Sequence, residues 1–208
     1  MTNKTINPNF VDCGTMNGDC GRGDCQIFWH GFFGTLLTGF SILDVGAGLG
    51  HSKQRLSHEG TNTITTQDIA PGQIVDITTP IEEIAENCYD IVTAFDVIEH
   101  VVEDEDFLRH MVRIATKSII ITTPNWNVSK CFNKYHAREY TPQELVDMLD
   151  VYGFAKVTYY SYDTRNQPDG PYDYDGFLQH CGGSPAHPSL ESFLKTPNMM
   201  LAVMADIT

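Results

Sequence analysis

The sequence predicts one α/β domain over residues 1–208, with a seven-stranded, mostly parallel sheet, a C-terminal antiparallel hairpin and helices on both faces. Short apolar runs alternate with helical patterns along the middle of the chain, which is typical of parallel strands joined by helices. The first of these runs ends in glycines at alternate positions, where open α/β sheets bind their ligands. Two strand-like runs close the chain and predict the hairpin.

Length and composition limit the kinds of protein to consider. A chain of 208 residues with 41% hydrophobic and 19% charged residues can form one full hydrophobic core. The formal net charge of −14 argues against a nucleic-acid partner, because such partners need basic patches. We find neither an apolar run of about 18 residues nor a signal-peptide pattern, and therefore expect a cytoplasmic protein without a membrane span. The sequence does not indicate the oligomeric state.

The N-terminal 40 residues are expected to form an arm and a cap segment. Residues 1–24 lack hydrophobic periodicity and predict an irregular arm, which carries cysteines at positions 13 and 20. With Cys25 and His30 they match no common zinc signature, so free thiols are favoured and a zinc module stays an alternative. Residues 25–38 are apolar and aromatic, and predict a helix broken by Gly31 and Gly34.

The stretch SILDVGAGLG, residues 41–50, predicts a buried strand followed by a tight loop. Glycines at positions 46, 48 and 50 are needed there because a Cβ would fill the ligand's space or forbid the turn. The spacing G-x-G-x-G differs from the dinucleotide pattern G-x-G-x-x-G, which disfavours a nicotinamide oxidoreductase. Residues 49–59 predict the following helix, ended by Gly60.

Two acids follow at the ends of the next two expected strands. The β-branched run 61–67 ends at Asp68, about 20 residues beyond the glycine loop, where carboxylates bind ribose hydroxyls in doubly wound folds. A simple turn role for Asp68 is the alternative. Residues 73–77 predict a very short third strand that contains Asp76, with no room for a helix before it.

The fourth expected strand, residues 89–95, leads into three potential metal ligands. Asp96, Glu99 and His100 are spaced i, i+3 and i+4, so a helical turn would place them on one side. Two carboxylates and an imidazole suit a divalent cation. A short helix over residues 80–86 precedes this strand.

The remaining elements complete the alternation. Residues 104–116 predict an amphipathic helix and residues 117–123 a buried strand, stopped by Pro124. Thr141, Pro142 and Glu144 together form a helix-start signature. Residues 155–162 and 198–207 predict the hairpin strands. The loop between them, 163–197, is either a lid with Tyr172, Tyr174 and Phe177 or an irregular surface patch.

Four stretches resemble motifs of class I S-adenosylmethionine (SAM) methyltransferases: LDVGAGLG (43–50), YDIVTAFDVIEHV (89–101), TTPN (122–125) and HAREYTPQEL (136–145). The resemblance is to the ubiquinone-biosynthesis O-methyltransferases and the methyltransferase type 11–12 group, and covers roughly residues 41–155. It implies a Rossmann-like fold and methyl transfer to an acceptor, favouring a hydroxyl oxygen of a small molecule or glycan. A non-catalytic SAM-binding scaffold and a methyltransferase acting on a nucleic-acid end are the alternatives.

The resemblance also implies where SAM would bind. In such enzymes the glycine loop holds the amino acid end of SAM, while Asp68 would bind the ribose and Asp76 the adenine. The N-terminal helix either closes over the cofactor or packs on the sheet, and Asn125 and Trp126 are candidate walls of the acceptor pocket. The implied cofactor-binding residues are Asp44, Gly46, Ala47, Gly48, Gly50, Asp68, Ile69, Asp76, Ile77 and Phe95.

A metal site follows from a narrower resemblance. The small-RNA 2′-O-methyltransferases carry a similar acid-x-x-Glu-His and use it with a later histidine to bind a metal. The resemblance therefore implies Mg²⁺ or another divalent ion at Asp96, Glu99, His100 and His136. Without a metal, His100 or His136 would act as general base, or Glu99 and His100 would orient the loop or touch the substrate.

Overall fold

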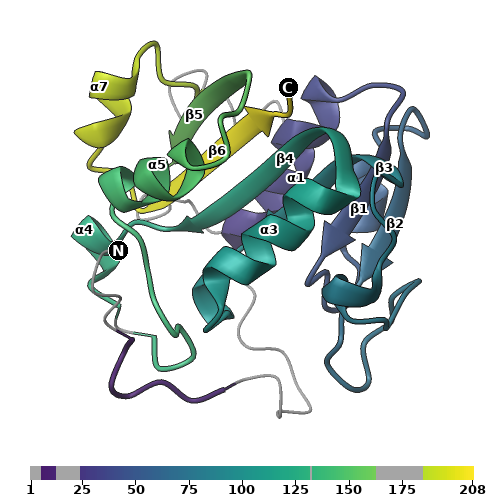
Figure 1. Cartoon of the computed structure of the whole chain (residues 1–208), viewed down its shortest axis with the longest axis horizontal. Coiled ribbons are helices and arrows are strands. Elements are labelled where there is room, and N and C mark those ends of the chain that lie inside the picture. The colour runs from purple at the N-terminus through teal and green to yellow at the C-terminus, as the bar shows by residue number, and fades with distance from the viewer. Residues whose placement is uncertain (1–5, 13–23, 132, 163–184) are drawn as a thin grey trace.

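A computed structural model describes residues 6–12, 24–131, 133–162 and 185–208. Its strands form a six-stranded sheet in the order β2-β1-β3-β4-β6-β5, with helices on both faces (Figure 1). The first four strands of that order are parallel, and β6 runs antiparallel to both β4 and β5, as the predicted hairpin requires. The strands are β1 (Ser41–Val45), β2 (Thr63–Gln67), β3 (Tyr89–Phe95), β4 (Ala115–Pro124), β5 (Lys156–Tyr162) and β6 (Met200–Asp206).

The expected seventh strand, residues 73–77, is wrong. This segment joins the sheet only at an isolated bridge between Gln67 and Ile77. The carboxylate of Asp76 accepts a hydrogen bond from the Thr66 backbone N–H at 2.9 Å, where a strand would offer a backbone carbonyl. Because a side chain takes the place of the backbone acceptor, the ladder ends there and β2 is the edge of the described sheet.

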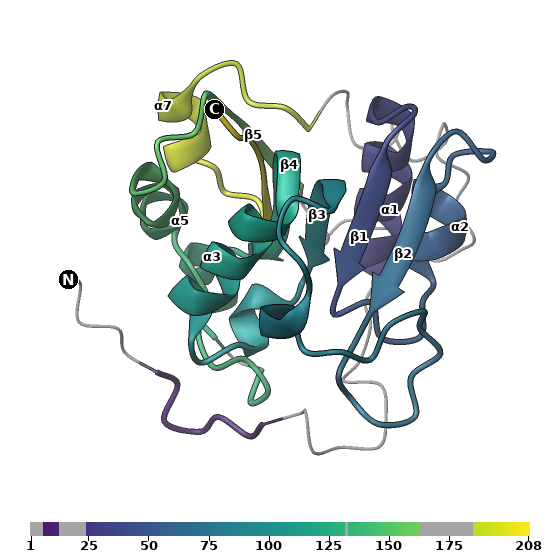
Figure 2. The same cartoon turned by 45° about the vertical axis from the view of Figure 1, so that its right-hand side comes forward.

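The helices divide between the two faces of the sheet, as Figures 1 and 2 show. Helices α1 (Asp24–Leu36) and α2 (Ser52–Leu56) cover one face. On the other lie α3 (Asp104–Ile114), α5 (Pro142–Asp150) and α7 (Leu190–Leu194). Shorter elements are η2 (Ile81–Glu83), η3 (Ile98–His100) and α4 (Trp126–Ser129). None of the helices among the described residues is long and apolar enough to cross a membrane.

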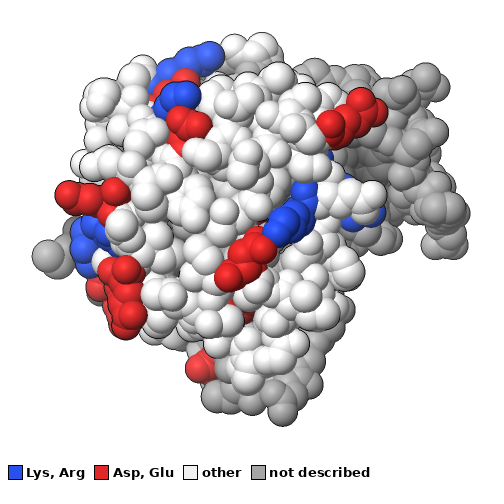
Figure 3. Space-filling view, turned by 90° about the vertical axis from the view of Figure 1, so that its right-hand side faces the viewer, with Lys and Arg blue, Asp and Glu red and all other residues white. Residues whose placement is uncertain are grey.

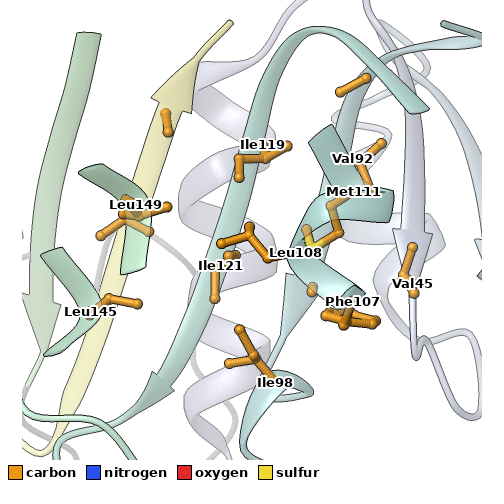
Figure 4. Packing of buried hydrophobic residues seen from close by; sticks show 14 of the residues in the cluster. Val45, Val92, Ile98, Phe107, Leu108, Met111, Ile119, Ile121, Leu145 and Leu149 are labelled. Atoms are coloured by element: carbon orange, nitrogen blue, oxygen red, sulfur yellow. The ribbon is translucent and has the colours of Figure 1, made fainter. Parts of the chain in front are cut away.

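Alternation along β4 explains why both faces are covered. Ile119 and Ile121 pack with Leu108 and Met111 of α3 (Figure 4). Ile120, between them, is buried in the cluster on the opposite face. Successive side chains of a strand point to opposite faces, so a run of isoleucines requires a helix layer on each side.

Helix α1 is continuous, so the predicted break at Gly31 and Gly34 is wrong. Its aromatic side chains, Phe28, Trp29, Phe32 and Phe33, are buried against the sheet, which confirms the packing interpretation. A Cβ at Gly34 would lie 2.4 Å from the Arg55 carbonyl oxygen. This glycine therefore allows α1 and α2 to approach closely instead of interrupting the helix.

We expect Gly34→Ala to destabilise the protein by about 1–3 kcal/mol, the usual cost of overpacking. At an uncrowded helical position the same change would stabilise, since alanine favours helix by up to about 1 kcal/mol. Denaturant unfolding measures the difference. Gly39→Ala measures backbone strain without crowding, about 1–2 kcal/mol, because the φ of Gly39 is +80° and no atom of the described residues lies within 4 Å of its added Cβ. Equal or higher stability of Gly34→Ala would contradict the close approach.

Two further expectations differ in extent from the structure. The helix expected over residues 49–59 is shorter, because His58 and Glu59 have φ values of 41° and 56°, outside the helical region. Residues 185–197 of the expected long loop include α7. The proposed lid residues Tyr172, Tyr174 and Phe177, and the cysteines at positions 13 and 20, lie outside the described residues.

Candidate functional site

The glycine loop between β1 and α2 is built on left-handed backbone. Gly46, Gly48 and Gly50 have φ values of 68°, 55° and 71°, a region that favours glycine. A Cβ at Gly46 would lie 2.6 Å from Val97, in the turn that follows β3. The loop and that turn are therefore in close contact at the carboxyl ends of β1 and β3.

Asp68, at the end of β2, braces the glycine loop from the side. Its Oδ2 accepts a hydrogen bond from the Gly48 N–H at 2.7 Å, and its Oδ1 accepts one from the Ala70 N–H at 2.8 Å. The Ala47 N–H donates to the Gln67 carbonyl at 2.9 Å. A carboxylate has about four acceptor positions, so these contacts leave capacity for a ribose hydroxyl. The ribose role of Asp68 stays a prediction.

The other two acids of the implied SAM site make structural contacts. Asp44 is buried in the sheet and accepts a hydrogen bond from the Thr93 hydroxyl at 2.8 Å. Asp76 forms an ion pair with Lys53 at 2.6 Å, and this hydrogen bond, with that from the Thr66 backbone, holds the carboxyl pKa below its ordinary value. Nothing in these contacts tests an adenine role for Asp76.

The apolar residues of the implied site lie in different environments. Ile69 is exposed, Ile77 is half-buried, and Phe95 is buried beneath α1. The Gln26 side chain of α1 donates to the Phe95 carbonyl at 3.2 Å. The N-terminal end of α1 therefore reaches the carboxyl end of β3, beside the glycine loop.

Three of the four predicted metal ligands come together. Glu99, His100 and His136 offer ligand atoms that all lie within 4.8 Å of one another. The two imidazole rings are nearly perpendicular, with centroids 4.9 Å apart. Asp96 lies outside this group, and its carboxylate accepts a hydrogen bond from the Thr122 hydroxyl at 2.5 Å.

His100 has its tautomer set by the backbone. Its Nδ1 donates to the Tyr135 carbonyl at 2.8 Å, so Nε2 carries the lone pair. Metal-binding histidines usually donate their second nitrogen to an oxygen in this way. Burial, together with the neighbouring His136, lowers the pKa of His100 to about 4. The ring is therefore neutral at neutral pH.

A buried carboxylate, Glu139, holds His136 and was missed by the sequence prediction. Its Oε1 accepts from His136 Nδ1 at 2.5 Å, and its Oε2 accepts from the Ser129 hydroxyl and the Cys131 N–H. Burial alone would raise the pKa of Glu139, but the hydrogen bonds from His136 and Ser129 keep it below its ordinary value. The Asn133 amide lies 2.9 Å from Nε2 of His136, so a cation at Nε2 would displace it.

Glu99 is the least satisfied member of the group. Its Oε2 is buried and has no hydrogen-bond partner among the described residues. Burial, and then the charge of Asp96, raise the pKa of Glu99 well above its ordinary value. A buried carboxylate oxygen without a hydrogen bond is costly, and a cation would offset that cost. Two imidazoles and a carboxylate form a donor set that divalent transition metals accept.

A second polar network fixes the loop that carries His136. The Arg138 N–H donates to the Glu99 carbonyl at 3.2 Å, and the Arg138 guanidinium donates to Asp104 and Glu144. Asp104 also accepts from the Tyr140 hydroxyl at 2.8 Å. Residues 136–140 are thereby held against η3, although the two segments are more than 35 positions apart in the sequence.

The candidate pocket residues after β4 have different roles. Asn125 is fully buried, caps α4 through the Asn127 N–H and donates to the Asn198 carbonyl at 2.9 Å. These hydrogen bonds of Asn125 are therefore structural. Trp126 is 41% exposed, and the Lys130 ammonium lies 4.0 Å above its ring.

Comparison with known proteins agrees with this architecture. Residues 43–120 match a family model described as a methyltransferase domain. This match runs from β1 into β4 and includes the glycine loop, Asp68 and the turn with Glu99 and His100. A comparison with curated proteins found no match.

Several solved structures share the fold. A SAM-dependent methyltransferase from Thermotoga maritima, described as a possible histamine N-methyltransferase, is 14% identical, with a TM-score of 0.62 over 88% of this chain and 89% of that one. A SAM-dependent methyltransferase from Archaeoglobus fulgidus is 14% identical, with a TM-score of 0.58 over 87% and 94%. The plantazolicin methyltransferase BpumL, in complex with SAH, is 16% identical, with a TM-score of 0.56 over 90% and 86%. The chain has the Rossmann-like fold of SAM-dependent methyltransferases.

Proposed function

We propose that this protein transfers a methyl group from SAM to an acceptor oxygen. The favoured acceptor is a hydroxyl of a small molecule or glycan. The observation that supports this most is the contact between the glycine loop and the turn after β3. Gly46 lies against Val97, and Val97 is two residues before Glu99. A cofactor held by the loop would thus face the cluster of Glu99, His100 and His136.

Bound SAM would supply an activated methyl group. The chain's contribution is then mainly to hold donor and acceptor in line and to lower the proton affinity of the acceptor. The glycine loop, kept in place by Asp68 and Gln67, is the rigid part on the donor side. Glu99, His100 and His136 form the part that would meet the acceptor.

We propose that the cluster holds a divalent cation. The buried, unpartnered Glu99 oxygen and the second-nitrogen hydrogen bonds of both histidines fit such an ion. A cation there would act as a Lewis acid on an acceptor hydroxyl. A base works best when its pKa lies near the working pH, so a His100 pKa of about 4 suits a ligand better than a general base.

The charge distribution favours a small-molecule or glycan acceptor over a nucleic-acid end. The chain carries 13 basic and 27 acidic residues. On the face that Figure 3 shows, lysine and arginine side chains lie beside acidic ones in the described part of the surface. Nucleic-acid binding depends on basic surfaces that displace counterions.

Calorimetric titration with SAM and with NADH tests the cofactor assignment. We expect the protein to bind SAM and not NADH. Asp68→Ala should weaken SAM binding by about 1.5–3 kcal/mol, the range for hydrogen bonds to a charged group. Asp106→Ala is the matched control, since Asp106 is exposed and pairs only with Arg109 among the contacts of the described residues. An unchanged dissociation constant for SAM in Asp68→Ala would show that Asp68 is only a turn residue.

An acceptor screen with and without added divalent metal tests the reaction. It should include phenols, sugars, carboxylates and nucleic-acid ends. It should also include an amine, because one similar structure is described as a possible histamine N-methyltransferase. SAM binding without turnover on any acceptor would favour the alternative of a non-catalytic SAM-binding protein.

A further inference from the structure

We propose that residues 6–11, here called the N-terminal strap, are part of this site and that Asn7 is a positioning residue for it. The strap would hold the loop of residues 133–137, which carries His136. The effect of Asn7 on metal binding rests on the proposed function, whereas its effect on the structure of the loop does not. Figures 1 and 2 both show the strap, in purple, running beside the green loop.

Backbone and side-chain hydrogen bonds join the strap to the loop. The Asn7 N–H donates to the Ala137 carbonyl at 2.8 Å, and the Val11 N–H donates to the Lys134 carbonyl at 2.7 Å. Between them, the Asn7 side-chain amide donates to the His136 carbonyl at 3.0 Å. The same amide lies 3.4 Å from the Asn133 carbonyl. The loop therefore offers four carbonyls to a segment more than 120 residues earlier in the sequence.

The remaining carbonyl of this loop segment faces the site. Tyr135 lies between the residues whose carbonyls contact the strap, and its own carbonyl accepts from His100 Nδ1 at 2.8 Å. The carbonyls on both sides of Tyr135 thus serve the strap, and the Tyr135 carbonyl serves His100. Fixing the strap side of the loop also fixes the acceptor of His100 and the backbone of His136.

Asn7 acts at both ends of this contact. Its Oδ1 accepts from the Asn9 N–H at 3.0 Å, which shapes the strap as a turn around Pro8, while its Nδ2 reaches the loop. Ile6 and Val11 are 40% and 44% exposed, so Phe10, which is half-buried, is the main apolar side chain that the strap contributes to docking. Hydrogen bonds through Asn7 add the polar part of the attachment.

Amide hydrogen exchange of the full chain tests whether the strap holds the loop of residues 133–137. In Asn7→Ala we expect exchange at His136 and Arg138 to accelerate roughly three- to tenfold, the factor for losing one hydrogen bond. Exchange in the central strands should not change. Asn9→Ala is the matched control, because only the backbone of Asn9 contacts Asn7. Asn7→Asp keeps the Oδ acceptor but loses the amide donor, and should accelerate exchange as Asn7→Ala does.

Calorimetric titration with Mn²⁺ and SAM tests whether Asn7 affects metal binding. We expect Asn7→Ala to weaken Mn²⁺ binding about tenfold, the lower end for residues that orient metal ligands, with SAM affinity unchanged. Unchanged exchange in Asn7→Ala, or equal acceleration in Asn9→Ala, would overturn the strap's role whatever the metal result. Accelerated exchange in a protein whose wild type binds no Mn²⁺ would support the strap and reject the proposed metal.

Discussion

Replacing His100 by alanine is expected to lower methyl transfer at least about a hundredfold while SAM affinity stays within about twofold. His100 lies in the acceptor-side cluster, and loss of one member would remove a metal ligand or an acceptor contact. It donates to the Tyr135 carbonyl, and its ring lies against that of His136, which carries the neighbouring potential metal ligand. Steady-state turnover with the acceptor found by screening, together with calorimetric titration of SAM, measures both quantities.

His110→Ala is the matched control, because His110 lies on α3 away from the cluster and bonds to Arg113. The control should keep wild-type turnover. Chelation then separates the two chemical roles of His100. Activity should fall with EDTA and return with Mg²⁺ or another divalent ion, and full activity after exhaustive chelation would exclude the metal.

The pH profile adds an independent check on His100. Its pKa is about 4, so below that pH the protonated ring could neither bind a metal nor accept a proton. Lowering the pH from 7 to 5 should therefore cause no loss of activity through this residue. A fall in activity centred near pH 6.5, the ordinary histidine value, together with an NMR titration of the His100 ring at that pH, would contradict the buried, neutral ring.

Local sequence signals predicted the elements whose boundaries depend on short-range interactions. The run YDIVTAF corresponds to β3, residue for residue. Thr141 and Glu144 form the expected capping box at the start of α5. These signals work because hydrophobic alternation and helix capping involve residues only a few positions apart.

Contacts between distant segments could not be predicted in the same way. The sequence predicts a helix break at Gly34, but glycine is needed there because the Arg55 carbonyl of another helix lies too close for a Cβ. The run around Asp76 had strand-like composition, but the side chain of Asp76 occupies the ladder position. Each outcome depends on which segment lies alongside, which composition alone does not specify.

The candidate site shows the same division. The spacing of Glu99 and His100 on one turn, and their convergence with His136, agree with the sequence prediction. Glu139 could have been found, because it stands three residues after His136 in a family-like string. The contribution of Asn7 carries no local signal, since its partners are more than 120 positions away.

Gly46→Val is expected to abolish SAM binding in a protein that still folds. The φ of Gly46 is +68°, where a β-branched residue is strained, and its Cβ would collide with Val97 at 2.6 Å. Relief requires the loop to move away from the turn after β3, or Val97 in that turn to shift away from the loop. Either movement disturbs the contact on which the proposed cofactor site rests. Calorimetric titration with SAM measures the loss, with circular dichroism to confirm folding.

Gly60→Val separates backbone strain from the collision. Gly60 has a φ of +85°, but none of the described residues places an atom within 4 Å of its added Cβ. This control should lose stability by about 1–2 kcal/mol, as left-handed backbone costs a non-glycine residue, and keep SAM affinity. Wild-type SAM affinity in folded Gly46→Val would show that the cofactor does not depend on this loop. Loss of affinity in both variants would show that strain, and not the contact with Val97, causes the effect.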